Sequence, residues 1–290
     1  MNVRKTIRPR RSFIFCPGIR PDLFEKALSA GSDMVCVELE DGIAPKDKKT
    51  ARERSLPLFK NSKVEEVEKI LRINSIRESF GIDDIQAILK MSNPPDAIML
   101  PKVKSPDEVL IVDSLLKESN HKTKLHIIIE TNQALESAVE IANCCSRVDA
   151  LFFGLIDMAA ELRCPVSWES LLYARSRVVH AAASAGIDVI DGPHLDLDDI
   201  EGMRKEAELA FELGFSGKGA IHPKQIPILN KIFTPSEEKI KRAKKIISLF
   251  ENADTGLVMY EGKLIEKPVI REMRRVISID SKISGNKNAY

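Results

Sequence analysis

The chain has 290 residues, 43% of them hydrophobic, and its 44 Lys and Arg residues balance 43 Asp and Glu residues. This length and apolar content suit one large domain with a buried core and exclude general disorder. The near-zero net charge argues against nucleic acid as the main partner. No apolar run reaches the ~18 residues that span a bilayer, and the basic start lacks an export signal. The five cysteines lack metal-ligand spacing, which predicts reduced thiols in a cytoplasmic protein without membrane contact.

Short apolar runs alternate with longer amphipathic segments as far as about Phe233. The runs are continuously apolar rather than alternating, which is typical of parallel strands covered on both faces. Eight runs predict strands, at Phe13–Cys16, Met34–Leu39, Ile70–Ile73, Ala97–Leu100, Leu125–Ile129, Ala150–Phe153, Ile187–Ile190 and Gly219–Ile221.

Helical patterns lie between these runs and carry start and stop signals. Pro21–Ala30 places apolar residues at helical spacing, and Ser105–Glu118 opens with an N-cap Ser followed by Pro. Asp198–Leu213 ends at Gly214, a residue type common just after a helix. Each strand with its helix takes roughly 25–35 residues. Eight such units predict a (β/α)8 barrel over residues 1–233, since this fold typically needs about 250 residues.

The remaining part, residues 234–290, is too short for a second ordinary domain. Ser236–Asn252 predicts a charged helix, and Gly256–Arg275 predicts a hairpin turning at Glu261-Gly262, then a helix. The polar end Ser284–Tyr290 is expected to fray. We interpret residues 234–290 as a lid extension that packs on the barrel or on a neighbouring subunit.

In a (β/α)8 barrel the active site lies where the strands end. The residues that follow the predicted strands supply six carboxylates and three cations: Glu38, Glu40, Asp41, Glu130, Asp157 and Asp191, with Arg20, Arg72 and Lys102. Carboxylates close together raise one another's pKa unless a cation lies between them. Without thiol or imidazole neighbours they favour a hard metal, and Glu130 with Asp157 is the best pair for Mg²⁺. Salt bridges that merely close the barrel top are the alternative.

Arg72 is the natural partner for a substrate carboxylate, because its planar guanidinium donates two parallel hydrogen bonds to such a group. An ion pair with Glu38 or Glu40 is the alternative for this residue. Lys102 is expected either to orient the acidic cluster or to contact the substrate.

Taken in order, these residues resemble the citrate lyase β-subunit-like enzymes, a family that includes malyl-CoA and citramalyl-CoA lyases. The likeness runs from Arg11 to about Pro268. Its motifs are Arg11-Ser-Phe-Ile-Phe-Cys-Pro-Gly18, Lys26-Ala27, Glu38-Leu-Glu-Asp41, Lys48, Ala51-Arg52, Arg72-Ile-Asn74, Pro101-Lys102, Ile129-Glu130-Thr131, Phe153-Gly154 with Asp157, and Gly217-Lys218 with Ile221-His222-Pro223.

The resemblance implies a Mg²⁺-dependent (β/α)8 lyase that acts on an acyl thioester of a hydroxy acid and releases a 2-oxo acid. It also implies that Glu130 and Asp157 bind Mg²⁺ and that Arg72 binds the carboxylate of the 2-oxo acid. Arg20 and Lys26 would lie near the thioester carrier. By the same resemblance the protein is a homo-oligomer, a trimer or hexamer, whose C-terminal lid reaches a neighbour's active site.

Two positions depart from the family pattern, in which Asp mostly stands where this chain has Glu38 and Glu266. Glu266 lies in Gly262-Lys-Leu-Ile-Glu-Lys-Pro268, at the position of the lid's catalytic Asp. Each Glu adds one methylene and moves its carboxylate by about 1 Å, a shift that matters to reaction rate. Glu266 is the candidate acid/base for the thioester fragment, and Asp41 is a second candidate.

Three interpretations of function follow. The first is a free-standing lyase of β-hydroxyacyl-CoA thioesters of the malyl, citramalyl or citryl type. The second is a citrate lyase β subunit that works on an acyl carrier protein within a complex. The third is a non-catalytic or regulatory homologue with an altered site. A metal aldolase of free hydroxy-oxo acids also fits the Glu, Asp and Arg set, but it needs neither the basic residues at the mouth nor the lid.

Overall fold

The computed structural model describes residues 8–60, 66–253 and 257–284. The chain divides into two compact units, a larger one formed by Arg10–Asn230 and a smaller one formed by Met1–Pro9 and Lys231–Tyr290. Gly256, where the predicted hairpin segment begins, and residues 285–290 of the end predicted to fray lie outside the described residues.

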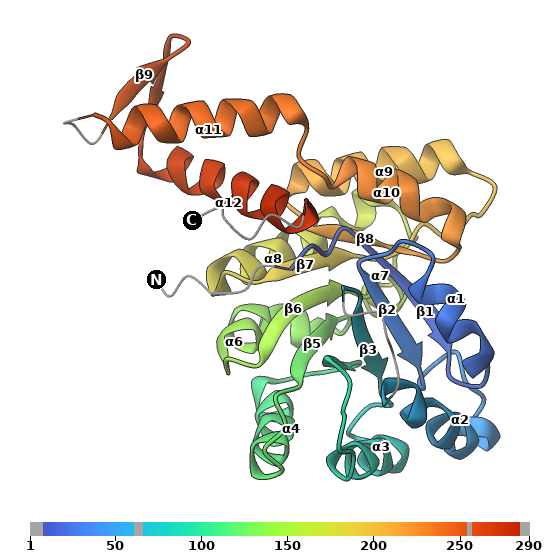
Figure 1. Cartoon of the computed structure of the whole chain (residues 1–290). Coiled ribbons are helices and arrows are strands. Elements are labelled where there is room, and N and C mark those ends of the chain that lie inside the picture. The colour runs from blue at the N-terminus through green and yellow to red at the C-terminus, as the bar shows by residue number, and fades with distance from the viewer. Residues whose placement is uncertain (1–7, 61–65, 254–256, 285–290) are drawn as a thin grey trace. The chain divides into compact units, whose positions relative to one another are not determined.

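In the described part of the larger unit, eight parallel strands follow one another around a closed barrel with helices outside it (Figure 1). Strand β1 pairs with both β2 and β8, which closes the ring. The predicted (β/α)8 barrel is confirmed. The strands are β1 (Ser12–Pro17), β2 (Met34–Glu38), β3 (Glu68–Arg72), β4 (Ala97–Leu100), β5 (Lys124–Ile129), β6 (Val148–Phe153), β7 (Asp188–Asp191) and β8 (Gly217–Ala220).

The helices of this unit begin and end at the local signals in the sequence. Thr131 and Ser167 each accept a backbone N–H at a helix start. Gly214 ends its helix with a φ of 111°, as predicted. The helices are α1 (Phe24–Leu28), α2 (Lys48–Ser55), α3 (Ser79–Leu89), α4 (Pro106–Glu118), α5 (Asn132–Glu136), α6 (Ala138–Asn143), α7 (Leu155–Leu162), α8 (Trp168–Ala185), α9 (Ile200–Leu213) and α10 (Ile226–Ile232).

Apolar side chains fill the inside of the barrel. The buried cluster consists of Phe13, Met34, Cys36, Ile70, Ala97, Met99, Ile128, Ala150, Phe152 and Ile190, with Phe15 packed against it. Successive side chains of a strand point to opposite faces. Residues two positions after Cys36, Ile70 and Ile128 therefore point inward as well, and these are Glu38, Arg72 and Glu130.

Strand β8 begins two residues earlier than the sequence predicts. Gly217 and Lys218 belong to it, and Lys218 pairs with Ser12 of β1. Gly217 lies so close to the chain before β1 that a Cβ atom would overlap the carbonyl oxygen of Arg10. Close approach of two backbones, rather than apolar character, fixes this end of the strand.

The smaller unit contains α11 (Glu237–Glu251), the antiparallel strands β9 (Val258–Tyr260) and β10 (Lys263–Ile265), and α12 (Lys267–Ile283). The hairpin turns at Glu261 and Gly262, as predicted, with φ values of 49° and 72°. The unit has its own apolar cluster, which consists of Ala243, Ile246, Ile265, Ile270, Met273 and Val276.

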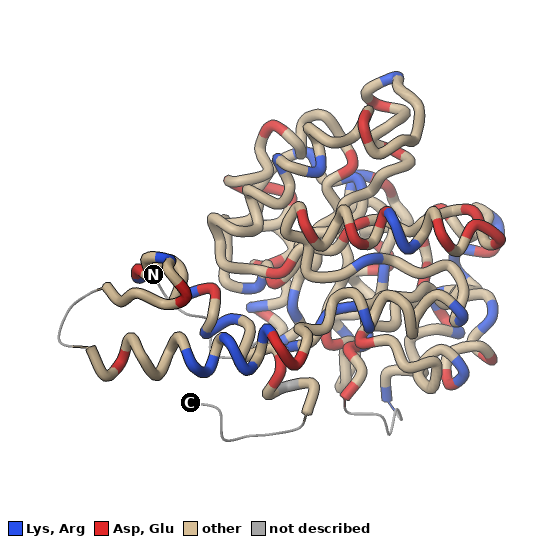
Figure 2. Tube along the Cα trace, turned by 90° about the horizontal axis from the view of Figure 1, so that it is seen from above, with Lys and Arg blue, Asp and Glu red and all other residues tan. Residues whose placement is uncertain are grey.

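Three general properties bear on function. Among the described residues no helix combines the length and apolar character that crossing a membrane requires. Lys and Arg residues and Asp and Glu residues are interspersed over the described chain (Figure 2). All five cysteines are free thiols, and Cys16 and Cys36 are buried.

Candidate active site

Charged side chains gather where five consecutive strands of the barrel end. Glu38, Arg72 and Glu130 lie at or just after the ends of β2, β3 and β5. Lys102 follows β4, and Asp157 lies in the first turn of α7, directly after β6. The carboxyl ends of parallel strands meet at one face of a barrel, which is where the active sites of this fold lie.

Arg72 is held by two carboxylates and an aromatic ring. Its Nε donates to Oε2 of Glu38, and its Nη1 lies 3.4 Å from Oε2 of Glu40. Its guanidinium carbon lies 4.8 Å from the centre of the Phe15 ring. Burial lowers the pKa of Arg72, but the charges of Glu38 and Glu40 raise it by a larger amount, so the net shift of the pKa is upward. The guanidinium is therefore charged and fixed, and the ion pair weighed as the alternative role of Arg72 is present.

Glu38 makes two contacts at once. Besides Arg72, its other carboxylate oxygen accepts the backbone N–H of Glu40. Burial raises the pKa of Glu38, and the charge of Arg72 opposes that rise. The side chain thus links the end of β2 to both the acidic turn that follows it and the end of β3.

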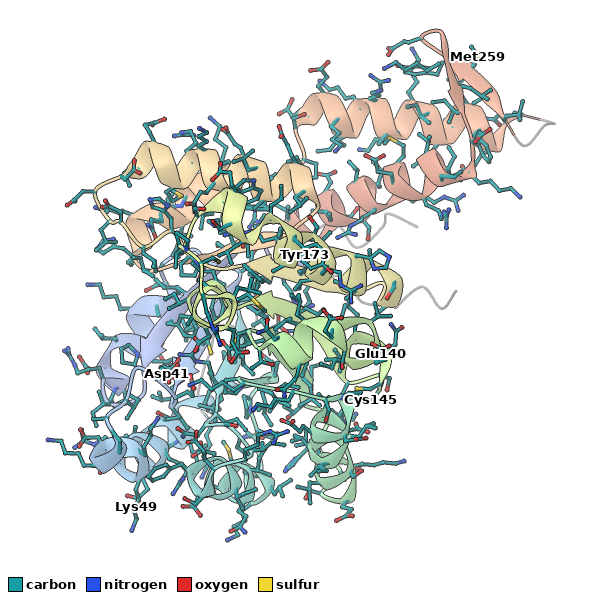
Figure 3. The ribbon with its side chains drawn as sticks, turned by 180° about the vertical axis from the view of Figure 1, so that it is seen from behind. Asp41, Lys49, Glu140, Cys145, Tyr173 and Met259 are labelled. Atoms are coloured by element: carbon teal, nitrogen blue, oxygen red, sulfur yellow. The ribbon has the colours of Figure 1, made fainter. Side chains whose placement is uncertain are left out.

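Lys102 organises the acidic cluster from the end of β4. Its φ of 53° is left-handed, a conformation that costs a residue with a Cβ atom about 1–2 kcal/mol. In this conformation its backbone N–H donates to Oε1 of Glu130 at 2.7 Å. Its Nζ lies 2.6 Å from Glu40 and 2.8 Å from Asp41, which is labelled in Figure 3. Of the two roles weighed for Lys102, orienting the cluster is the one its contacts support.

Glu130 is a buried carboxyl group with other carboxyl groups close to it. Its residue is 3% exposed. Burial, and then the charges of Asp157 and Glu40, raise the pKa of Glu130 to about 8, although the N–H of Lys102 opposes the shift. Gly154 makes room for this carboxylate, because a Cβ atom there would overlap Oε2 of Glu130.

The residues present fit a hard divalent cation. The carboxyl groups of Glu38, Glu40 and Asp41 pair with the two cations Arg72 and Lys102. Those of Glu130 and Asp157 lie near enough for the charge of Asp157 to act on Glu130. Within the described part of the chain, the buried Oε2 of Glu40 makes no hydrogen bond. An oxygen-only donor set with uncompensated negative charge is the environment in which proteins bind Mg²⁺.

Sequence reasoning missed the side chain that shapes the acidic turn. The buried Nζ of Lys48, at the start of α2, donates to the carbonyl oxygens of Leu39 and Glu40 at 3.0 and 2.6 Å. These bonds fix the backbone that presents Glu40 and Asp41. The signal in the sequence is the recurrence of Lys48 in the family motif after the acidic turn.

Two predicted site residues lie outside the cluster, and a third belongs to the smaller unit. Arg20 is 59% exposed and forms an ion pair with Asp22 at 2.7 Å. Lys26 is exposed on α1. Glu266 belongs to the smaller unit, where it is exposed and precedes α12. Asp41 is part of the cluster, at its edge, with 56% of its side chain exposed.

The prediction that Asp191 joins the cluster is wrong. Its carboxylate accepts from Nε of Arg175 in α8 at 3.0 Å and from Nζ of Lys218 at 2.6 Å. Because Ile190 points into the barrel, Asp191 points outward, towards the helices. Its buried ion pairs join the sheet to the helix layer.

Comparison with known proteins agrees with this geometry. A family model described as HpcH/HpaI aldolase/citrate lyase matches residues 11–223. The chain is 31% identical over 285 residues to citrate lyase subunit beta of Leuconostoc mesenteroides subsp. cremoris, covering 94% of this chain and 93% of that one. It is also 31% identical over 307 residues to L-malyl-CoA/beta-methylmalyl-CoA lyase of Cereibacter sphaeroides, covering 96% of each. The chain also resembles the crystal structure of CitE from Mycobacterium tuberculosis in complex with magnesium, acetoacetate and coenzyme A. The two sequences are 27% identical, the TM-score is 0.76, and the match covers 93% of this chain and 97% of that one.

Proposed function

The chain belongs to the HpcH/HpaI aldolase/citrate lyase family, and we propose that it is a Mg²⁺-dependent carbon–carbon lyase. Its substrate is a β-hydroxyacyl thioester of the malyl, citramalyl or citryl type, and its products are a 2-oxo acid and acetyl-CoA or a related thioester. The observation that carries the proposal is the buried Glu130 carboxyl group, whose pKa is raised to about 8 by burial and by the nearby charges of Asp157 and Glu40. Burying the carboxyl groups of Glu130 and Asp157 close together costs folding free energy unless they bind a ligand.

Glu130 and Asp157 are the residues that would hold Mg²⁺, which supplies a Lewis acid for substrate oxygens when bound. Arg72 binds the carboxylate that becomes part of the 2-oxo acid. Glu38 and Phe15 fix the guanidinium in advance, so the substrate carboxylate meets a preset partner. Holding the carboxylate at a fixed place makes the following bond cleavage effectively intramolecular.

Cleavage needs a base for the hydroxyl proton and an acid for the departing carbon. Although partial burial raises the pKa of Asp41, its hydrogen bond to Lys102 lowers it overall, so Asp41 is ionised at neutral pH and is able to accept the hydroxyl proton. The electron pair of the broken C–C bond passes to the α-carbon of the thioester. We assign the proton that this carbon then takes up to Glu266 of the lid. One proton is accepted and one is donated, so the reaction balances.

Arg20 and Lys26 are the candidate contacts of the thioester carrier. Both are exposed cations that follow β1, one in its loop and one on α1. Exposed cations suit the phosphate groups shared by coenzyme A and the prosthetic group of an acyl carrier protein. The related structure from Mycobacterium tuberculosis contains coenzyme A, which is one of these phosphate-bearing carriers.

The second candidate is a citrate lyase β subunit that acts on an acyl carrier protein. Sequence identity does not separate it from the first, because the two relatives differ in activity and are both 31% identical. A non-catalytic homologue is less well supported, since an inactive site has no reason to keep Glu130, Asp157 and Arg72 together. An assay that offers CoA thioesters and carrier-protein thioesters side by side distinguishes the two enzymes.

Three further features belong to this proposal. Residues 234–290 form the lid extension that brings Glu266 to a neighbour's barrel. The protein is therefore a homotrimer or hexamer, which light scattering of the purified chain would measure. The five free cysteines favour a reducing compartment, the cytoplasm, as its place of work.

Substitution of the two metal-binding carboxylates tests the proposal. Glu130→Ala and Asp157→Ala should each abolish Mg²⁺-dependent cleavage of malyl-CoA-type thioesters. The matched control is Glu140→Gln, which removes an exposed carboxylate on α6 and should leave the rate unchanged. Retained activity in either alanine variant would overturn the mechanism.

A further inference from the structure

A second group of buried charges lies at the opposite end of the barrel from the candidate active site. Glu68 and Asp188 begin β3 and β7, and His126 and Asp149 stand near the starts of β5 and β6. Arg10 precedes β1 and joins them. These residues therefore surround the N-terminal ends of the strands, and the proposed lyase reaction uses none of them.

Arg10 uses its whole guanidinium within this group. Its Nε and Nη2 donate to the two oxygens of Glu68 at 2.7 and 2.9 Å. Its Nη2 and Nη1 also bond the carboxylate and the carbonyl oxygen of Asp149, and Nη1 bonds Asp188 at 3.1 Å. One positive charge thus faces three carboxylates.

His126 has an ion-pair contact in this group but, among the described residues, no hydrogen bond. It is 0% exposed, and within the described chain neither of its ring nitrogens makes a hydrogen bond. Its Nε2 lies 3.4 Å from Oε1 of Glu68, and the ring of Phe152 packs 5.4 Å from its own. A buried polar group without a hydrogen bond costs about 1–3 kcal/mol. The imidazole thus lies beside a carboxylate, and neither of its ring nitrogens makes a hydrogen bond in the part of the chain that the structure describes.

A β-bulge adds Asp149 to this group. Leu125 pairs with Val148 and the next residue, His126, pairs with Ala150, so the register passes over Asp149. A bulged residue leaves the regular alternation of faces, and bulges commonly re-aim a side chain at a functional site. Here the bulge brings a carboxylate of β6 to the imidazole of β5.

We infer that Glu68, His126 and Asp149 form a binding site for a divalent transition-metal ion, with Zn²⁺ as its natural probe. One ligand atom from each of the three residues lies within 4.8 Å of the others. Ligand atoms around one Zn²⁺ at about 2.0–2.2 Å lie roughly 3–3.6 Å apart, so a contraction of about 1 Å completes the site. The distance between Nε2 of His126 and Oε1 of Glu68 is already in that range.

The donor set and the charge select the ion. One imidazole with two carboxylates suits Zn²⁺, Mn²⁺ or Fe²⁺, whereas Mg²⁺ prefers oxygen ligands alone. A divalent cation would add positive charge beside the carboxylates of Glu68 and Asp149, which Arg10 also contacts. The side chain of Asp149 is 19% exposed, which gives the ion a path from solvent. The site ties β3, β5 and β6 together, and its expected effect is on stability.

The test uses the full chain with Glu130→Gln and Asp157→Asn, which remove metal binding at the mouth of the barrel. After incubation with Zn²⁺ and desalting, this variant should retain about one Zn²⁺ per chain by elemental analysis, and its melting temperature should rise with Zn²⁺ concentration. Adding His126→Gln or Asp149→Asn should lower Zn²⁺ affinity at least tenfold by titration.

The control is His180→Gln, because His180 is an exposed histidine on α8, and it should change neither stoichiometry nor affinity. The inference is overturned if the parent retains no Zn²⁺, or if His126→Gln and Asp149→Asn bind as tightly as the parent. Should His126→Gln not fold, Asp149→Asn decides the outcome, since its side chain is partly exposed and its replacement is nearly isosteric.

Discussion

Lowering the pH from 8 to 6 should weaken Mg²⁺ binding, because the ion must displace a proton from Glu130. The pKa of Glu130 is raised to about 8, whereas Mg²⁺ binds the carboxylate. At pH 7 only about 10% of a group with that pKa is ionised, and at pH 6 about 1%. The apparent affinity should therefore rise about 50-fold between pH 6 and pH 8, and should level off above pH 9.

Calorimetric titration of the substrate-free protein with Mg²⁺ measures both the affinity and the proton. In two buffers of different ionisation enthalpy at pH 7, the difference in heat should correspond to the release of about 0.9 proton per ion bound. Glu130→Gln, which removes the proposed ligand, should bind Mg²⁺ far more weakly at both pH values and release no proton. An affinity that stays within twofold from pH 6 to pH 8, with no proton released, would refute the assignment of Glu130 as a protonated ligand.

Four further outcomes are expected. In the absence of Mg²⁺, the free energy of unfolding should fall as the pH rises from about 5 to 9, since folded Glu130 (pKa about 8) holds its proton more tightly than the unfolded chain does; urea titration should show a loss of at most about 5 kcal/mol, absent in Glu130→Gln. Gly154→Ala should weaken Mg²⁺ binding at least tenfold by calorimetry without unfolding the barrel, because the new Cβ atom overlaps Oε2 of Glu130. Glu38→Asp should withdraw the carboxylate from Arg72 and lower the unfolding free energy by about 1–3 kcal/mol in urea, and the less firmly fixed guanidinium should raise the KM for substrate in a lyase assay. Arg10→Met should lower the unfolding free energy in urea by about 3–5 kcal/mol, because the buried carboxylates of Glu68 and Asp149 lose their cation. Unchanged stability would show that these carboxyl groups do not need the charge of Arg10.

The barrel was predictable from sequence because its strands are buried on both faces. Runs such as Ala97–Leu100 have no polar residue to obscure them, and the predicted and observed bounds agree. Strand β8 was placed late because Gly217 and Lys218 are not apolar. Its start depends on contact with the chain before β1, a contact between residues about two hundred positions apart. A sequence pattern contains no measure of such a contact.

The direction in which a strand residue points can be predicted from sequence, but this requires knowing which alternate residues of the strand face the barrel interior, and not only where the strand ends. Glu38 and Glu130 each stand two residues after an interior residue, and both point to the mouth. Asp191 stands one residue after Ile190 and points to the helices. Counting strand ends alone therefore admitted one carboxylate too many. The role of Lys48 is not predictable from residue types for another reason, since its hydrogen bonds go to backbone carbonyl oxygens, which every residue has.

Unbalanced charge and strained backbone occur together at one place in the barrel, and this coincidence supports the function more strongly than any single residue. The buried carboxylate of Asp191, by contrast, is paired with Arg175 and Lys218. At the mouth, Lys102 adopts a left-handed φ of 53° and directs its N–H at Glu130, a carboxyl group whose burial already raises its pKa. Both features oppose folding, and each is explained if the mouth was selected to bind a cation and its substrate. A set of salt bridges that only closed the barrel would have no need of either.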